Sequence, residues 1–188
     1  MNVPMAATFG THLQGKLPGK RHFAKLCDVL SSVPPGNVVF LDFTGVEVVT
    51  GSWVNALFVP FFQWAGGEET DLYPVICNLA VQEWFDEFAL VADWTHRCFL
   101  VANGPIPASR ARAVGPLDPG QKATLSAVIE FGPVTGAELE RQWKVETIKA
   151  TAWNNRLRDL YDKRLIRKER RGREQVYSTV LKEIEFDG

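Results

Sequence analysis

The run VVFLDF at Val38–Phe43 limits the folds open to this chain more than any other segment. It is apolar, has the length of a strand and is rich in β-branched and aromatic residues, which predicts a central strand buried on both faces. A predicted helix follows from Ser52, and its apolar stripe begins at Trp53. A buried strand that leads directly into an amphipathic helix is typical of an α/β layer, in which helices cover a sheet.

The same alternation of strand and helix patterns continues through the first hundred residues. We expect strands at residues 6–9, 38–43, 73–80 and 97–103, and helices at residues 20–30, from 52 onward and at 82–92. Strands that alternate with helices predict a mostly parallel or mixed sheet. The predicted fold class for residues 1–104 is therefore an α/β domain with a mixed sheet and flanking helices.

The segment NGPIPASRARAVGPLDPG, residues 103–120, is rich in Pro, Gly and Ala and has no periodicity. Such composition predicts a linker, which we place at residues 105–118. A second domain is then expected at residues 119–188. The chain is long enough for two small domains of this size.

The second domain begins with three helical patterns, at residues 119–131, after Thr135 and at about residues 146–163. Thr135 and Glu138 have the spacing of a capping box. Two strand patterns with a tight turn at Gly172 follow. Three helices and a hairpin within about 70 residues predict an α+β winged helix-turn-helix domain.

The two halves of the chain carry opposite charge. Residues 1–105 contain 5 Lys and Arg against 10 Asp and Glu, a net charge of −5. Residues 106–188 contain 16 against 12, a net charge of +4. This asymmetry predicts different partners for the two halves, and the basic half favours nucleic acid.

Several function classes are disfavoured by the residues present. The three cysteines, Cys27, Cys77 and Cys98, lie in apolar surroundings and predict reduced core thiols in a cytoplasmic protein. Cys and His residues do not cluster with metal-ligand spacing, and the longest apolar run is too short to span a bilayer. We therefore expect no metal and no membrane partner.

Catalysis is also disfavoured. Residues 10–16, GTHLQGK, have the spacing of a phosphate-binding loop, but Leu17 follows where a Ser or Thr is required, and Pro18 opposes the helix. Ser52 and Asp42 have no well-placed histidine to complete a triad. The chain is predicted not to be an enzyme and to need no cofactor.

The third helical pattern of the second half has one apolar face and one polar face. Trp153, Leu157 and Leu160 share the apolar side, and Thr151 and Asn155 lie on the other. A B-DNA major groove admits one helix whose outward side chains read base edges. The candidate DNA-contacting residues are Thr147, Lys149, Thr151, Asn154, Asn155 and Arg158 on the helix, with Arg170, Arg171 and Arg173 at the turn of the hairpin.

The segment TAWNNRLRDLYDKRLIRKERRGREQVYS, residues 151–178, resembles the recognition helix and wing of winged-helix bacterial transcription regulators. The resemblance implies a DNA-binding regulator. Two alternatives stay open: a solvated surface helix beside a charged turn, and a winged helix that serves as a protein–protein module.

The first half carries a second resemblance. The segment VVFLDFTGVEVVTGSWVNALF resembles the central motif of STAS domains, the small α/β domains of anti-sigma-factor antagonists, and more closely a STAS-like family of uncharacterised bacterial domains. The positions that agree with the latter are Leu41–Phe43, Gly45–Val46, Val49–Thr50, Ser52, Leu57–Phe58 and Pro60. The resemblance implies a regulatory partner protein, which in the STAS family is an ATP-binding kinase of the anti-sigma type.

Ser52 matches the STAS phosphoacceptor, counted from Asp42, and Thr50 is the neighbouring hydroxyl. Free N–H groups at a helix start favour an anion, and a phosphate would add nearly two negative charges there. The alternative is that Ser52 only caps the helix. Trp84 and Trp94 predict an apolar surface patch that would suit a partner or a homodimer.

Overall fold

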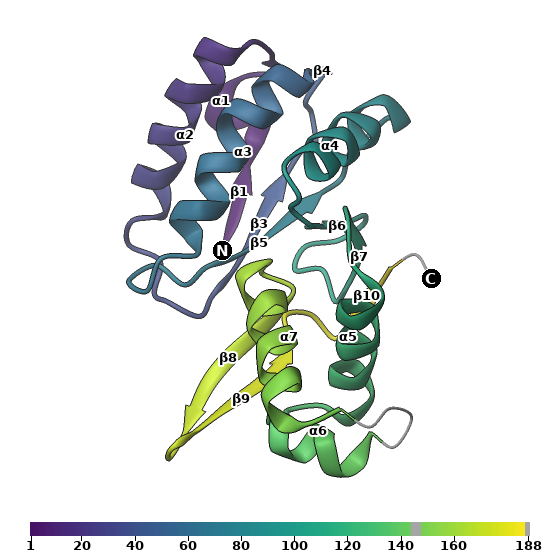
Figure 1. Ribbon diagram of the computed structural model, residues 1–188. Helices are drawn as coiled ribbons and strands as arrows, with labels where there is room; N and C mark the ends of the chain where they lie inside the picture. Colours follow the sequence, from purple (N-terminus) through teal and green to yellow (C-terminus); the bar gives the residue numbers. More distant parts are fainter. Residues whose placement is uncertain (144–147, 187–188) are drawn as a thin grey trace.

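The computed structural model describes residues 1–143 and 148–186. Within them, six strands form one mixed sheet in the order β1-β3-β5-β6-β7-β10 (Figure 1). These strands are β1 (Asn2–Pro4), β3 (Val38–Asp42), β5 (Tyr73–Cys77), β6 (Phe99–Ala102), β7 (Arg110–Val114) and β10 (Glu183–Glu185). Strands β1, β3, β5 and β6 are parallel, β7 is antiparallel to β6, and β10 is parallel to β7. The prediction of an α/β fold with a mixed sheet is confirmed.

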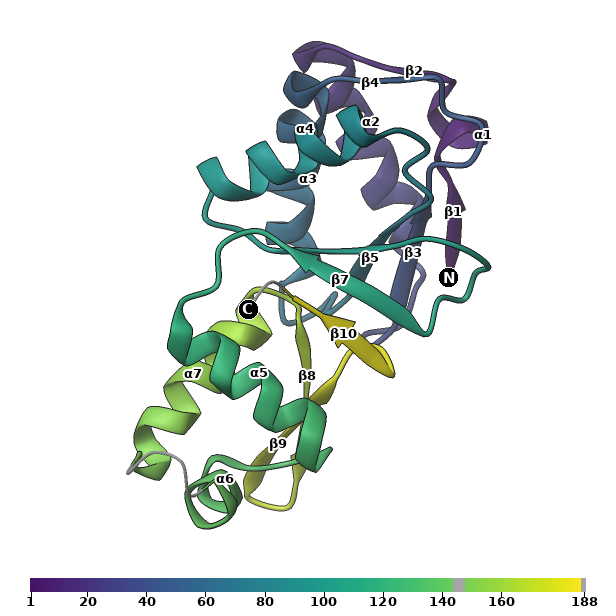
Figure 2. The same cartoon turned by 90° about the vertical axis from the view of Figure 1, so that its right-hand side faces the viewer.

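Helices α2 (Lys16–Leu30), α3 (Gly51–Ala65) and α4 (Gln82–Trp94) all cover one face of this sheet (Figure 2). The parallel strands follow one another across the sheet in chain order, and right-handed crossovers that step in one direction place their helices on one side. Aromatic rings fill this layer. Phe58 on α3 meets Phe88 on α4 with 4.9 Å between ring centroids, and Phe88 meets Phe43 below at 5.6 Å.

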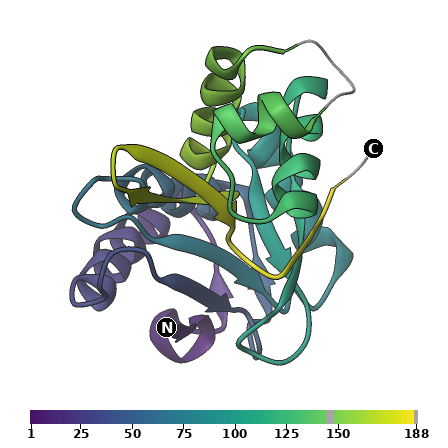
Figure 3. The same cartoon turned by 90° about the horizontal axis from the view of Figure 1, so that it is seen from below.

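The opposite face of the sheet is covered by the C-terminal part of the chain. Its strand residues, such as Phe40, Val75 and Leu100, share one apolar core with Trp153 and Leu157 of helix α7 (Ala150–Asp162). Helix α5 (Pro119–Phe131) adds further residues to this core. Figure 3 shows these helices in front of the sheet. The buried strand residues alternate between two helical layers, as a strand buried on both faces requires.

The linker predicted at residues 105–118 is not a free tether. Residues Arg110–Val114 form β7, which pairs with β6 on one side and with β10 on the other. Strand β10 comes from the end of the chain, and Ile184 enters the core shared with α5 and α7. Residues of both predicted domains therefore contribute to one sheet and one core.

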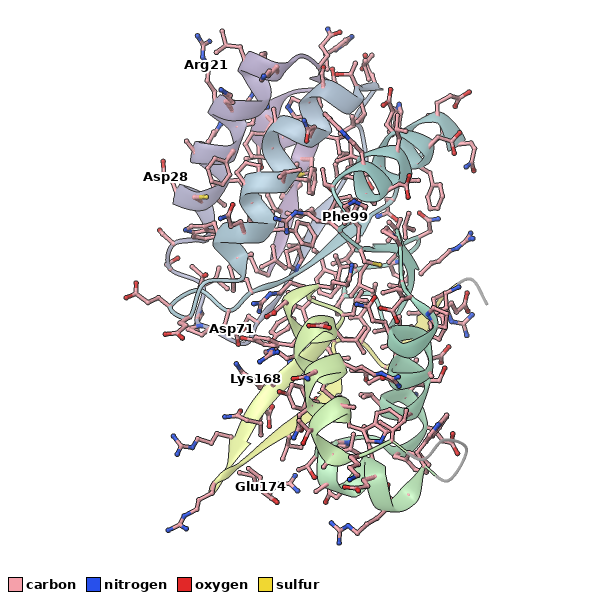
Figure 4. The ribbon with its side chains drawn as sticks, viewed as in Figure 1. Arg21, Asp28, Asp71, Phe99, Lys168 and Glu174 are labelled. Atoms are coloured by element: carbon pink, nitrogen blue, oxygen red, sulfur yellow. The ribbon has the colours of Figure 1, made fainter. Side chains whose placement is uncertain are left out.

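Polar contacts reinforce this junction where α7 ends. The carboxylate of Asp71, in the loop before β5, accepts hydrogen bonds from Tyr161 Oη at 2.7 Å and Arg164 Nη1 at 2.7 Å. Lys163 Nζ donates to the carbonyl oxygen of His96 at 2.9 Å. Figure 4 places Asp71 where the upper and lower parts of the molecule meet. The end of α7 is fixed to the sheet layer by side chains from several loops.

The remaining elements are short. Helix α1 (Met5–Phe9) occupies the segment predicted as a strand at residues 6–9, and that prediction is wrong. Strands β2 (His12–Leu13) and β4 (Val48–Val49) pair with each other. Helix α6 (Gly136–Gln142) precedes α7, and β8 (Ile166–Arg171) pairs with β9 (Glu174–Thr179). The predicted order of three helices and a hairpin is present.

Candidate functional site

Helix α7 is positioned by its apolar side and by α6. Trp153, Leu157 and Leu160 are fully buried at the spacing of one helix face. The backbone N–H of Ala150 donates to Glu140 Oε2 on α6 at 3.0 Å, so a neighbouring helix satisfies one free N–H at the start of α7. A Cβ at Gly136 of α6 would clash with Asn154 Oδ1, so α6 and α7 cross where glycine allows close approach.

The start of α6 confirms the predicted capping box. The backbone N–H of Glu138 donates to Thr135 Oγ1 at 3.1 Å, and the N–H of Thr135 donates to Glu138 Oε2 at 2.7 Å. A single β-bridge between Val134 and Tyr177 then ties the segment before α6 to β9. Local capping and this bridge hold α6, α7 and the hairpin in one arrangement.

The side of α7 that the sequence predicts to contact DNA faces solvent. Thr151, Asn155 and Arg158 are exposed on the side opposite the buried residues, and Arg158 Nη2 donates to Asn155 Oδ1 at 3.3 Å. Lys149 is exposed at the N-cap position. Thr147 lies outside the described residues.

The hairpin places its arginines at a free tip. Gly172, with φ of 64°, forms the turn, and Arg170, Arg171 and Arg173 beside it are exposed. Arg170 Nε donates to the carbonyl oxygen of Gly172 at 3.1 Å. In Figure 4 the hairpin extends away from the body, with Lys168 along it and Glu174 near its tip.

A groove of about 400 Å³ joins these two elements. Its lining includes Asn154, Asn155 and Arg158 of α7, Arg173 of the hairpin and Tyr177 of β9. Four of the predicted DNA-contacting residues therefore meet around one groove. Lys149, Thr151, Arg170 and Arg171 lie outside its lining. The Asn154 amide also packs against Gly136, and Asn154, Asn155 and Arg158 are all exposed.

The predicted phosphoacceptor Ser52 and its neighbour Thr50, here called the hydroxyl site, lie at the start of α3. This is the other end of the molecule from the hairpin (Figure 1). Helix α3 begins at Gly51 with Thr50 as its N-cap, so the expectation that Ser52 caps the helix is wrong. Ser52 is exposed, and its Oγ lies 3.3 Å from Thr50 Oγ1. Thr50 Oγ1 also accepts a hydrogen bond from the backbone N–H of Gly15 at 3.2 Å. Thr50 is therefore a structural acceptor, while the Ser52 hydroxyl faces solvent.

Asp42 ends β3 and organises this edge of the sheet. Its Oδ1 accepts from Thr44 Oγ1 at 2.7 Å, from the Thr44 backbone N–H at 3.1 Å and from Asn78 Nδ2 at 2.9 Å. Burial alone would raise the pKa of Asp42, but these hydrogen bonds together lower it below its usual value. Asn78 Oδ1 in turn accepts from the backbone N–H of Gly104. The carboxylate thus links the ends of β3, β5 and β6, and its hydrogen-bond partners among the described residues do not include Ser52.

One acidic neighbour of this site was not predicted from the sequence. A Cβ at Gly51 would clash with Glu87 Oε2, so the Glu87 carboxylate of α4 lies against the first residue of α3. A phosphate on Ser52 would be close to this carboxylate, and like charges repel. Sequence reasoning missed Glu87 because 36 residues separate it from Gly51 and no local pattern connects the two.

Comparison with family models, with curated proteins and with solved structures found no match. Any proposal for the function therefore depends on the geometry of this chain. Among the described residues, no group of His, Cys, Asp and Glu could hold a metal ion. In the same part of the chain, no helix has both the length and the apolar character needed to cross a bilayer.

Proposed function

We propose that the protein is a regulatory DNA-binding protein, in which α6, α7 and the β8–β9 hairpin act as a winged helix on duplex DNA. The observation that carries this proposal is the open side of α7. Thr151, Asn155 and Arg158 face solvent, while the apolar side of the same helix is fully buried. These side chains have few internal hydrogen-bond partners, and their polar groups suit base edges.

The chemistry of these groups fits the major groove. Asn155 can pair with adenine through its amide, and Arg158 can donate to guanine O6 and N7. Arg170, Arg171 and Arg173 at the hairpin tip suit phosphate oxygens, which position a protein without reading sequence. The groove between α7 and the hairpin brings Arg158 and Arg173 to the same surface.

The test compares two triple variants with equal charge change. The first replaces Arg170, Arg171 and Arg173 with Ala. The control replaces Lys16, Lys20 and Arg21 with Ala. These three residues are also exposed and belong to α2, and Figure 4 shows Arg21 at the opposite end of the molecule. Binding to mixed duplexes is measured by fluorescence anisotropy between about 50 and about 200 mM salt.

The wild-type protein and the control should bind with salt-dependent affinity. The hairpin variant should bind more weakly, and the slope of log affinity against log salt should flatten by about 3, because about 0.9 counterion is released per phosphate contact. Equal loss in both variants would contradict a role of the hairpin.

For the first half of the chain we propose a STAS-like signal-receiving role centred on Ser52. Its support is the exposure of the Ser52 hydroxyl at a helix start beside Thr50. The proposed partner is a regulatory protein, such as an ATP-binding kinase of the anti-sigma type. Affinity capture with Ser52→Asp and Ser52→Ala as paired baits tests this role. Identical sets of captured proteins would remove it.

A second candidate is a partner-switching protein whose winged helix does not contact DNA. Glu169 and Glu174 lie among the hairpin arginines, so the tip is mixed in charge and could suit a protein surface. Absence of duplex binding at every salt concentration would favour this candidate over the first.

A further inference from the structure

Helix α4 presents the most exposed apolar pair of the described residues. Trp94 is 72% exposed and Leu90 is 65% exposed, the two highest values among the large apolar side chains of the described residues. They are one turn apart and therefore lie on the same side of the helix. Trp84, which the sequence grouped with Trp94, is buried instead.

Carboxylates surround this pair. Asp86 and Glu87 precede Leu90 by four and three residues, so both lie one turn before it on the helix surface. Glu83 and Asp93 add two more, and α4 contains no Lys, Arg or His. Such a surface is complementary to a partner that has apolar side chains at its centre and positive charge around them.

A groove flanks the same helix on the side of β7. Phe85, Ala89 and Asp93 of α4 line it together with Arg112, Gly115 and Pro116, and it has a volume of about 340 Å³. The guanidinium of Arg112 lies over the Phe85 ring, 5.7 Å from its centroid, on the β7 side of the helix. Beyond the Phe85 end, a hollow of about 370 Å³ is lined by apolar residues such as Leu79 and Val81 and by the polar residues Gln82, Asn103 and Arg112. The outer side of α4 thus combines the projecting side chains of Leu90 and Trp94 with a groove beside the helix.

We infer that the outer face of α4 docks a basic amphipathic helix of a second protein. Its apolar side would cover Leu90 and Trp94, and its Lys or Arg side chains would meet the exposed carboxylates of Glu83, Asp86 and Asp93. A second copy of this chain is the less suitable occupant, because a two-fold pairing of α4 would set these carboxylates against each other. The surface is separate from the proposed DNA-contacting face, so the inference does not depend on DNA binding.

A model peptide tests this directly. The probe is a helical peptide of about 18 residues with Leu and Ala on one side and Lys on the other, and its matched control has Glu in place of Lys. Binding is measured by isothermal titration calorimetry. The Lys peptide should bind the wild-type protein, and the Glu peptide should not.

Variants then locate the binding site. Leu90→Ser with Trp94→Ser should weaken binding at least about tenfold, and Asp86→Asn with Glu83→Gln should weaken it several-fold. The control is Leu17→Ser on α2, because Leu17 is 60% exposed but lies on another helix. It should bind the peptide as the wild type does. Circular dichroism checks that each variant is folded.

A second measurement needs no variant. Acrylamide quenches exposed tryptophan, and Trp94 is far more exposed than the buried Trp53, Trp84 and Trp153. The Lys peptide should lower the quenchable fraction of the fluorescence. The inference is overturned if the Lys peptide does not bind, or if the Leu90/Trp94 variant binds it unchanged. A wild-type dimer in sedimentation that the same variant dissociates would also overturn it, because a second copy would then be the occupant.

Discussion

The guanidinium of Arg164 donates to the carboxylate of Asp71 at 2.7 Å, although 93 residues separate them. The Arg164 side chain is 3% exposed, and its Nη2 also donates to the carbonyl oxygen of Gly66 at 2.9 Å. The guanidinium lies over the ring of Tyr161 with 4.4 Å to its centroid. This ion pair joins the end of α7 to the loop before β5, so the orientation of α7 is fixed relative to the sheet.

Replacing Asp71 with Asn should therefore destabilise the protein strongly. Asn keeps the shape and tolerates the positive φ of 38° at this position, but it leaves the buried Arg164 charge without a counter-charge. We expect the free energy of unfolding to fall by about 3 kcal/mol, as when one partner of a buried ion pair is removed. Urea unfolding measures the change.

The control for that variant is Arg110→Ala, which breaks the 2.6 Å ion pair with Glu183 at the surface. Both side chains of this pair are well exposed, so its loss should leave the urea midpoint nearly unchanged. Equal destabilisation by both variants would show that burial of Arg164 does not matter.

The whole chain should unfold in a single transition, because the sheet and the C-terminal helices share one core. Leu157→Ala removes a fully buried side chain from that core and should lower the free energy of unfolding by about 2–5 kcal/mol. Calorimetry should show one peak that moves as a whole. Two peaks, of which only one moves, would indicate independently folding domains.

Stability should fall as the pH drops below the ordinary histidine pKa, and His22 is one cause. Its Nδ1 accepts a hydrogen bond from Trp53 Nε1 at 3.0 Å, which requires a neutral ring. Burial, and then the nearby charge of Lys25, lower the pKa of His22 below its ordinary value of 6.5. The unfolded chain therefore binds a proton more readily, and stability is lost as the pH falls from 6.5 toward the folded pKa.

His22→Asn tests this pH dependence. The Asn amide can supply an acceptor in place of Nδ1 but does not titrate in this range. The variant should lose less stability than the wild type between about pH 7.5 and pH 5, as measured by thermal unfolding at each pH. Parallel curves for the two proteins would rule out His22 as a contributor.

Ser52 and Thr50 should differ in their effect on stability. Ser52→Ala should change the free energy of unfolding by less than about 0.5 kcal/mol, since the Ser52 side chain is exposed and does not cap α3. Thr50→Val keeps the shape but leaves the Gly15 N–H without its acceptor, and should cost about 1 kcal/mol. Chemical denaturation distinguishes the two. A larger loss from Ser52→Ala would restore Ser52 as the structural hydroxyl.

The sequence alone predicts which side of α7 faces outward. It also predicts the approximate positions of β3, β5, β6, α4 and the β8–β9 hairpin. Each depends on periodicity or on turn and cap residues that are close in the chain, such as Thr135 with Glu138. Hydrogen bonds within a helix or a tight hairpin are local, so a local pattern is enough to predict them. The predicted hydroxyl site was placed at the correct helix start but with the wrong capping residue.

Only the tertiary structure decided how the halves join. Residues Arg110–Val114 lie in a segment whose composition is typical of a linker, and Glu183–Glu185 is a three-residue strand with charged ends. Strand β7 also pairs with β6, but β10 pairs in the sheet only with β7, and about 70 residues separate those two strands. The sheet face left bare by α2, α3 and α4 must be buried, and the C-terminal helices bury it. That requirement is a property of the whole fold, because no single segment contains both the surface to be covered and the residues that cover it.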